Sequence, residues 1–91
     1  MKDETILTRH PGGKQGRKIP KDKYDAVKRA MLSALRSREL THTELMRALS
    51  RKLKGEFDGN VNWYGETVKL DLEARRVVER TGTMPQRYRL R

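Results

Sequence analysis

Four residues near the middle of the chain, Thr41-His42-Thr43-Glu44, constrain the fold more than any other feature, because they set the point where a helix begins. In a capping box, the Thr41 hydroxyl accepts a hydrogen bond from the Glu44 backbone, and the Glu44 carboxylate accepts one from the Thr41 backbone. Gly55 then suits the end of a helix. Between these two signals the apolar residues recur at helical spacing: Leu45, Ala48, Leu49 and Leu53. The sequence therefore predicts an amphipathic helix from Thr41 to about Gly55.

Two more helices are predicted, one on each side of this segment. Residues 22–36 repeat apolar side chains every three or four positions, with Asp22 as the expected N-cap. Residues 62–75 follow a loop, and either Asn60 or Asn62 is expected to cap that helix. Its apolar residues lie on two roughly opposite sides: Val61, Tyr64, Val68 and Leu72 on the first, and Trp63, Leu70 and Ala74 on the second. A helix that is apolar on two sides is buried on two sides, so the N-terminal segment, the C-terminal hairpin or another subunit is expected to cover the second side.

The C-terminal residues predict a β-hairpin. Residues 77–80 favour a strand, residues 81–85 supply turn-forming residues, and residues 86–91 alternate in polarity. The alternation places the basic residues on one face and the apolar residues on the other: Arg87, Arg89 and Arg91 against Tyr88 and Leu90. Leu40, in the short extended stretch 37–40 between the first two helices, is expected to be buried in or beside a short strand.

Residues 1–19 are expected to behave differently from residues 20–91. The run from His10 to Lys18 contains three glycines and one proline, and it shows no apolar periodicity. Such a run buries too little apolar surface to offset the entropy lost when it becomes ordered. The sequence therefore predicts a flexible basic arm over residues 1–19 and one small folded domain over residues 20–91.

Composition excludes several classes of function. The chain has no cysteine, which removes disulfides and every zinc site built on sulfur. The only histidines, His10 and His42, have no carboxylates at metal-binding spacing, and no serine has a partner base, so we expect no metal, no cofactor and no enzyme activity. No phosphate-binding glycine motif is present, and no small-molecule ligand is expected. No apolar run approaches the roughly 20 residues that span a bilayer, so we predict a cytoplasmic protein without membrane contact.

The order of the predicted elements resembles that of winged helix–turn–helix domains: helix, short strand, helix, helix and a two-stranded wing. The segment from Val68 to Arg80 also resembles the end of the recognition helix and the first wing strand of bacterial repressors. Those repressors have a turn glycine where this chain has Arg76. A turn that needs a positive φ at this position would therefore strain Arg76.

A closer resemblance covers most of the chain. It lies in five segments: His10-Pro11-Gly12, Lys23-Tyr24-Asp25-Ala26-Val27, Trp63-Tyr64, residues 67–75, and Pro85-Gln86-Arg87-Tyr88. In these segments and in its layout the chain resembles a family of small, largely uncharacterised bacterial winged-helix proteins. The resemblance implies an α+β winged helix–turn–helix fold, with three helices, a short strand and a C-terminal two-stranded wing. It brings no established binding residues with it.

The charge balance points to a polyanionic partner. The chain has 22 Lys and Arg against 12 Asp and Glu, a net charge of +10, which favours nucleic-acid binding. Residues 59–80, which contain the third helix, carry four basic and four acidic residues, which argues against strong binding by that helix. We predict a DNA-binding winged-helix protein in transcriptional regulation, with double-stranded DNA as its partner. The alternatives are a protein-interaction module, including a homodimer, and RNA binding by the same positive surface.

The candidate DNA contacts divide by role. Base readout in the major groove is expected from the third helix: Asn62, Glu66, Thr67 and Lys69. Phosphate contacts are expected from the second helix and the hairpin: Arg47, Arg51, Lys52, Lys54, Arg80, Arg87 and Arg89. For both sets the alternative interpretation is a solvated polar surface.

Overall fold

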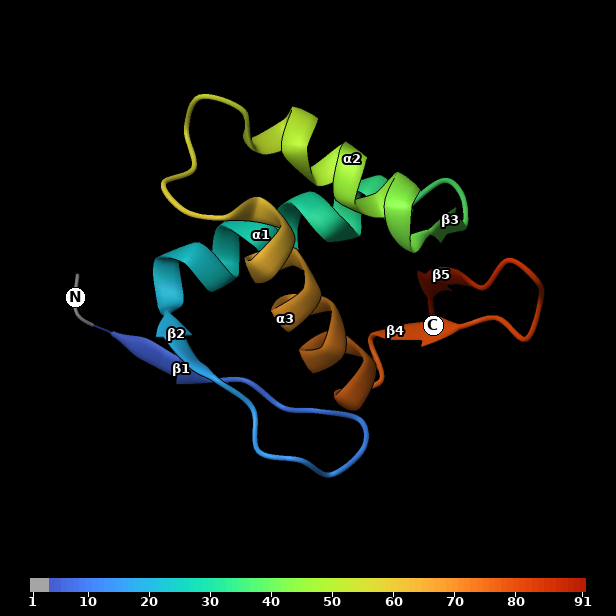
Figure 1. Cartoon of the computed structure of the whole chain (residues 1–91), viewed down its shortest axis with the longest axis horizontal. Helices are drawn as coiled ribbons and strands as arrows, with labels where there is room; N and C mark the ends of the chain where they lie inside the picture. The colour runs from blue at the N-terminus through green and yellow to red at the C-terminus, as the bar shows by residue number, and fades with distance from the viewer. Residues whose placement is uncertain (1–3) are drawn as a thin grey trace.

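The computed structural model describes residues 4–91, which form a small α+β domain with three helices and two antiparallel sheets (Figure 1). The elements in chain order are β1 (Thr5–Leu7), β2 (Lys18–Pro20), α1 (Lys21–Leu35), β3 (Leu40–Thr41), α2 (His42–Leu53), α3 (Val61–Ala74), β4 (Val78–Arg80) and β5 (Arg87–Leu90). One sheet pairs β1 with β2, and the other has the order β3-β5-β4. The three predicted helices, the short strand at Leu40 and the C-terminal hairpin are all confirmed.

The predicted start of α2 is confirmed in detail. The Thr41 hydroxyl accepts from the Glu44 backbone at 3.2 Å, and the Glu44 carboxylate accepts from the Thr41 backbone at 2.9 Å. Asn60 caps α3 by accepting from the Trp63 backbone at 2.9 Å. Only the cap of α1 was wrong, because Pro20 occupies that position and Asp22 lies in the first turn. An N-cap residue needs an extended backbone, and Pro20 already has one as the last residue of β2, paired with Thr5.

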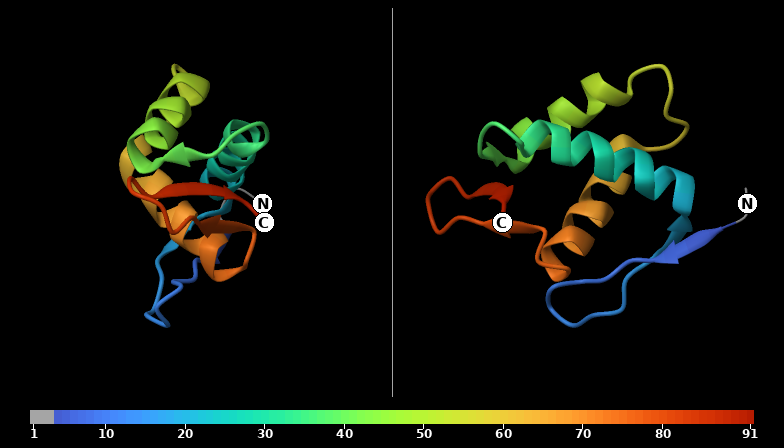
Figure 2. Two further views of the ribbon diagram at one scale, coloured as in Figure 1. Left: turned by 90° about the vertical axis from the view of Figure 1, so that its right-hand side faces the viewer. Right: turned by 180° about the vertical axis from the view of Figure 1, so that it is seen from behind.

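The three helices pack against one another around one core. In Figure 1 α3 crosses in front of α1, and the view from behind shows α1 on the nearer side (Figure 2). The N-terminal hairpin β1–β2 and the C-terminal hairpin β4–β5 flank the C-terminal end of α3. Fully buried side chains from all of these layers fill the core: Ile19, Val27, Met31, Leu45, Leu49, Val68, Leu72 and Val78.

The N-terminal segment differs from the predicted irregular arm. Its described residues form the β1–β2 hairpin, and beyond the strands Thr8 and Arg17 exchange two hydrogen bonds of 2.8 Å. Gly16 allows this approach, because a Cβ atom there would lie 1.9 Å from the Thr8 carbonyl oxygen. The glycine therefore serves close backbone contact, a reason for glycine that composition does not reveal. Residues 1–3 of the predicted arm lie outside the described part of the chain.

A buried carboxylate holds this hairpin against the helices. Asp71 of α3 is fully buried and accepts hydrogen bonds from the Arg9 backbone at 2.8 Å, from the Tyr24 hydroxyl of α1, and from the Arg75 guanidinium at 2.9 Å. Burial, followed by the hydrogen bond to Asp71, raises the pKa of Tyr24, so this hydroxyl stays protonated and donates. The predicted boundary between residues 19 and 20 therefore crosses a packed and hydrogen-bonded unit.

The turn between α3 and β4 needs a positive φ, as the sequence analysis considered. Arg76 has a φ of 65°, and its backbone N–H donates to the Glu73 carbonyl at 3.1 Å. A left-handed conformation costs a residue with a side chain about 1–2 kcal/mol. This strain lies at the joint where the C-terminal hairpin leaves α3.

Candidate functional site

Four exposed basic side chains without an ion pair within residues 4–91 lie along α2 and at its C-terminal end. We call Arg47, Arg51, Lys52 and Lys54 the α2 basic surface; all four are exposed. Within residues 4–91 none of them forms an ion pair, and the one polar contact is from the Lys52 ammonium to the Ser33 hydroxyl at 3.2 Å. Arg51 and Lys52 lie in the last turn of α2, where the helix dipole favours cations without neutralising them. The structure thus brings together the four α2 residues that the sequence proposed for phosphate contact.

A hollow between α2 and α3 joins this surface to the start of the third helix. It is lined by His42, Thr43, Met46, Arg47, Ser50 and Asn62. Arg47 therefore belongs both to the α2 basic surface and to a hollow that contains an exposed Asn62. A guanidinium group suits a phosphate, and an amide can pair with the edge of adenine. In this hollow a predicted phosphate contact, Arg47, and a predicted base contact, Asn62, line the same depression.

Lys69 is not available for base readout, so that part of the prediction was wrong. Its side chain is 3% exposed, and its ammonium lies 3.0 Å from Glu66, 2.9 Å from His42 Nδ1 and 3.1 Å from the Tyr88 hydroxyl. The same ammonium lies 4.2 Å from the centre of the Tyr88 ring. The hairpin strand β5 covers this part of α3, and a carboxylate, a hydroxyl and an aromatic face replace the water that the ammonium loses.

The groups around Lys69 have shifted pKa values. Burial lowers the pKa of His42, and the positive charge of Lys69 lowers it further. Burial raises the pKa of Glu66, but the hydrogen bond and charge of Lys69 outweigh that effect, and the net pKa is lowered. At neutral pH His42 is therefore uncharged and Glu66 is an anion paired with Lys69. The start of α3 accordingly presents Asn62 and Glu66 as exposed polar groups, with Thr67 half-buried beside them and little net charge.

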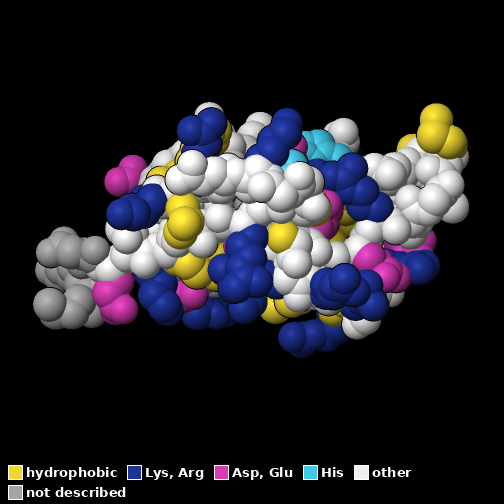
Figure 3. Space-filling model, turned by 90° about the horizontal axis from the view of Figure 1, so that it is seen from below, with side chains coloured by type: hydrophobic (Ala, Val, Ile, Leu, Met, Phe, Trp, Pro, Cys, Tyr) yellow, Lys and Arg dark blue, Asp and Glu magenta, His cyan; other side chains and the backbone are white. Residues whose placement is uncertain are grey.

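Most arginines of the C-terminal hairpin already form ion pairs. Arg80 bonds Glu73 at 3.0 Å, and Arg89 bonds Glu79 at 2.6 Å and Glu39 at 3.2 Å. Arg87 is half-buried and forms no ion pair within residues 4–91. The surface seen from below shows Lys and Arg side chains scattered among acidic ones (Figure 3).

The register of the hairpin also separates these arginines. Arg80 pairs with Tyr88, whereas Glu79 pairs with Arg89. Directly opposite residues share a face of the sheet, so Arg80 lies on the Tyr88 face, away from Arg87 and Arg89. Arg80 therefore cannot contribute to the same phosphate-binding face as Arg87 and Arg89.

The second apolar side of α3 is only partly covered. The N-terminal hairpin reaches its C-terminal half, where Asp71 bonds the Arg9 backbone, and Leu70 and Ala74 are half-buried. Trp63 at the other end is 45% exposed, and its ring packs edge-on against Tyr64 with centroids 5.0 Å apart. Homodimerisation through this side stays a prediction.

Sequence reasoning missed a second group of polar residues, on the other side of α2. Ser33, Ser37 and Arg38 line a groove together with Arg51 and Lys52. The sequence analysis treated residues 37–40 only as an extended link, and the adjacent charges of Arg36 and Arg38 were the one available signal. No group of three or more metal-binding side chains was found in residues 4–91, and no helix there has the length and apolarity to cross a membrane.

These features define a small, basic α+β domain with three helices and two hairpins. The chain belongs to a family described as "Family of unknown function (DUF6958)", whose model matches residues 5–88. No curated protein and no solved structure matches the chain.

Proposed function

We propose that this protein is a winged-helix DNA-binding protein that acts in transcriptional regulation. The topology supports the fold: the order α1-β3-α2-α3-β4-β5 and the sheet order β3-β5-β4 agree with a helix–turn–helix of α2 and α3 followed by a wing of β4 and β5. The two-residue strand β3 pairs with β5 through Leu40 and Tyr88, which attaches the wing to the start of α2.

The observation that carries the proposal is the α2 basic surface beside the α2–α3 hollow. The four cations have no acidic partner within residues 4–91, so a phosphate backbone would meet charges that no internal ion pair has to release. Arg47 would hold a phosphate at the rim of the hollow, and Asn62 would reach a base edge next to it. Glu66 lies one turn further along α3, where its carboxylate can accept from a cytosine amino group.

The structure changes the expected balance of contacts. The α2 residues Arg47, Arg51, Lys52 and Lys54 would supply most of the phosphate contacts, and Arg87 would contribute from the hairpin. Arg80 and Arg89 would contribute less, because each must exchange an existing carboxylate for a phosphate.

The test is binding to duplex DNA at several salt concentrations. Two double variants remove the same charge: Arg47→Ala/Arg51→Ala from α2 and Arg80→Ala/Arg89→Ala from the hairpin. Each lost phosphate contact lowers the slope of log K against log salt by roughly 0.9. The slope of the α2 variant should therefore fall by close to the value for two contacts, and that of the hairpin variant by less than the value for one. Asn62→Ala should instead change sequence preference, by about 1–3 kcal/mol for a good base contact.

A wild-type protein that binds no duplex below millimolar concentrations at low salt would overturn the DNA proposal. Trp63 then favours the second candidate, a protein-interaction module, because 45% of this large apolar side chain is exposed at the start of α3. In that case sedimentation should show self-association that Trp63→Ala reduces and that salt leaves almost unchanged.

A further inference from the structure

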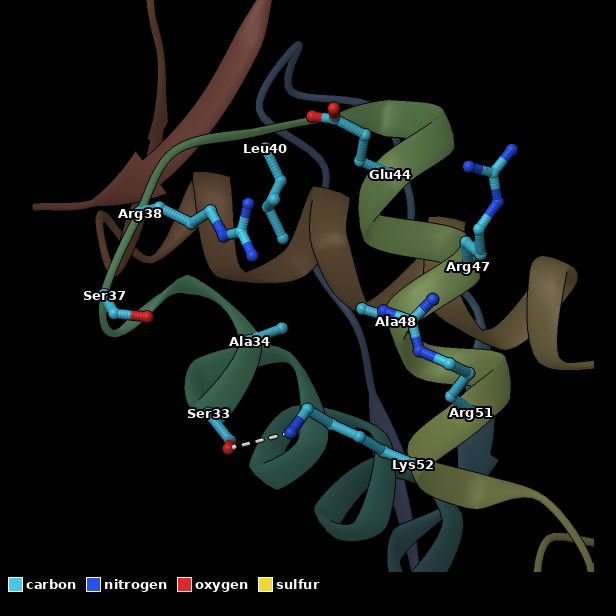
Figure 4. Close-up of a pocket in the computed structure, with 10 residues that line it drawn as sticks. All are labelled: Ser33, Ala34, Ser37, Arg38, Leu40, Glu44, Arg47, Ala48, Arg51 and Lys52. Carbon is cyan, nitrogen blue, oxygen red and sulfur yellow. Dashed lines mark hydrogen bonds between the residues drawn. The ribbon is translucent and has the colours of Figure 1, made fainter.

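The groove between the end of α1 and α2 differs from the α2–α3 hollow in how its cations are aimed. It has a cavity volume of about 310 Å³, which is in the range of small-ligand sites. The Arg38 and Arg51 guanidinium groups point into the groove from opposite sides, and the Lys52 ammonium reaches across it to the Ser33 hydroxyl (Figure 4). Arg47 also lines the groove, but its guanidinium is turned away from it.

Hydroxyl groups complete the polar lining. Ser33 lies on the last turns of α1, and Ser37 lies in the loop that follows, with its hydroxyl on the groove side (Figure 4). Three cationic and two hydroxyl groups from three consecutive parts of the fold therefore surround one hollow. Their donors match the several oxygen atoms of a tetrahedral anion.

One acidic side chain, Glu44, lies among the described lining residues, and it already accepts a hydrogen bond in the capping box. Glu44 stands at one end of the groove, and its carboxylate accepts from the Thr41 backbone at 2.9 Å in the capping box. The backbone hydrogen bond from Thr41 lowers the pKa of Glu44 and outweighs burial, which raises it; the Thr41 hydroxyl adds to the lowering. Glu44 is thus an anion at neutral pH, and with Arg38, Arg51 and Lys52 it leaves the groove with two uncompensated positive charges.

We propose that this groove binds the phosphate group of a phosphate monoester. A monoester carries close to two negative charges at pH 7, which matches the two uncompensated charges, whereas a phosphodiester in a nucleic-acid backbone carries one. The monoester can come from a small phosphorylated metabolite or from the terminal phosphate of a nucleic acid. In this proposal Arg38 and Arg51 bind the phosphate oxygens from opposite sides of the groove, and Lys52 binds them from α2. The hydroxyl groups of Ser33 and Ser37 donate to the phosphate from the α1 side.

This site does not depend on duplex binding, although Arg51 and Lys52 belong to both surfaces. Arg38 separates them, because it lines the groove and is not part of the α2 basic surface. Arg36 provides the matched control, because it is exposed and does not line the groove. Arg36→Ala removes the same charge as Arg38→Ala, two positions earlier in the chain.

The experiment titrates the full chain with inorganic phosphate and with a nucleoside 5′-monophosphate, using the unphosphorylated nucleoside as the blank. Amide chemical shifts of residues 33–52 report binding. We expect saturable binding of both phosphates, no binding of the nucleoside, and about a tenfold loss in Arg38→Ala with little change in Arg36→Ala. A short single-stranded oligonucleotide, with and without a 5′-phosphate, separates the two sources of the monoester. If the groove accepts the terminal phosphate of a nucleic acid, the phosphorylated strand should bind more tightly; if it accepts only small metabolites, the two strands should bind equally.

Acidification provides a further check. The second pKa of a phosphate monoester is about 6, so affinity should fall between pH 7.5 and pH 5. The charged groups that line the groove are Arg38, Arg51, Lys52 and Glu44, with Arg47 turned away at its rim, and the lowered pKa of Glu44 keeps that carboxylate an anion over this range. Equal losses in Arg38→Ala and Arg36→Ala, or shifts spread over the whole surface, would overturn the site. If the protein binds duplex DNA but not the phosphates, only this inference is overturned. If it binds the phosphates but not duplex DNA, only the proposed function is overturned.

Discussion

The outer side of α2 and the C-terminal hairpin look alike in sequence, because both are rich in basic residues, but their charges are used differently. The α2 cations have no ion-pair partner within residues 4–91, whereas Arg80 and Arg89 are bound to Glu73, Glu79 and Glu39. An exposed ion pair competes with a ligand for the cation and weakens its binding by up to about 1 kcal/mol. The comparison teaches that the position of the acidic residues, more than the number of basic ones, decides which surface can attract a polyanion.

The largest expected effect concerns a buried cation on the hairpin side. Lys69→Met keeps the length of the side chain and removes the ammonium that joins Glu66, His42 and Tyr88. Losing hydrogen bonds to a buried charged group should lower the free energy of unfolding by about 1–3 kcal/mol, several degrees in Tm for so small a domain. Lys54→Met, from the α2 basic surface, is the control and should stay within about 0.5 kcal/mol. Equal effects of the two variants would remove the distinction between the regions.

A pair of single variants should separate stability from binding. Arg80→Ala leaves Glu73, whose side chain is 7% exposed, without its cation, and should cost about 1 kcal/mol of stability with little change in the salt slope of duplex binding. Arg47→Ala should do the reverse, with a slope lower by roughly 0.9 and an unchanged stability. Thermal unfolding and a salt titration on the same samples measure both quantities. If Arg80→Ala lowers the slope as much as Arg47→Ala does, the hairpin charges are available after all.

The comparison can also be changed by releasing the hairpin cations. Glu79→Gln removes the carboxylate that contacts Arg89 at 2.6 Å and Arg91 at 3.9 Å, and leaves Arg89 only its second contact, Glu39 at 3.2 Å. If the ion pairs prevent these arginines from contacting DNA, duplex affinity should rise severalfold. The slope of log K against log salt should then increase by up to roughly 0.9 for each cation that reaches a phosphate. Glu56→Gln makes the same change of net charge at an exposed loop residue that has no ion pair within residues 4–91. An equal rise in both variants would mean that net charge alone matters.

The smallest expected effect is a pH dependence at the contact between the two regions. Burial, followed by the charge of Lys69, lowers the pKa of His42, so the unfolded chain binds this proton more readily than the folded chain. Stability is therefore greatest above the ordinary histidine pKa of about 6.5 and falls as the pH drops through that value. His42 is partly exposed, so we expect a decrease in Tm of only about one or two degrees between pH 7.5 and pH 5.5 beyond that of His42→Gln. An identical decrease in both proteins would show that His42 does not cause it.

The elements with local signals were predictable. The capping box, an asparagine cap at residue 60 or 62, and the alternation in residues 86–91 each depend on residues close together in the chain. The structure confirms the box and the alternation and shows that Asn60 is the cap. The sequence marked Arg76 as the residue that a positive φ would strain but left the form of the turn open, and the structure gives Arg76 a φ of 65°. These features are decided within a few residues, because hydrogen bonds to the next turn and side-chain periodicity do not require a tertiary partner.

The errors share one cause, which is a contact with a distant part of the chain. Lys69 was assigned to base readout because its helical position is polar, but Tyr88 of β5 covers it. The N-terminal segment was predicted to be an irregular arm because it is rich in glycine, but Asp71 binds its backbone from a distance of 62 residues. The groove that includes Arg38 was missed because its members come from α1, the following loop and α2.

The sequence alone therefore determined the number of helices, their order, the C-terminal hairpin and the excess of positive charge. Only the tertiary structure decided which of those charges remain free: it pairs Arg80 and Arg89 with acids, buries Lys69, and leaves Arg47, Arg51, Lys52 and Lys54 without an acidic partner in residues 4–91. The physical reason is the range of the interactions. Helices and turns depend on neighbours along the chain, whereas the burial and pairing of a charge depend on atoms that only folding brings within a few ångströms.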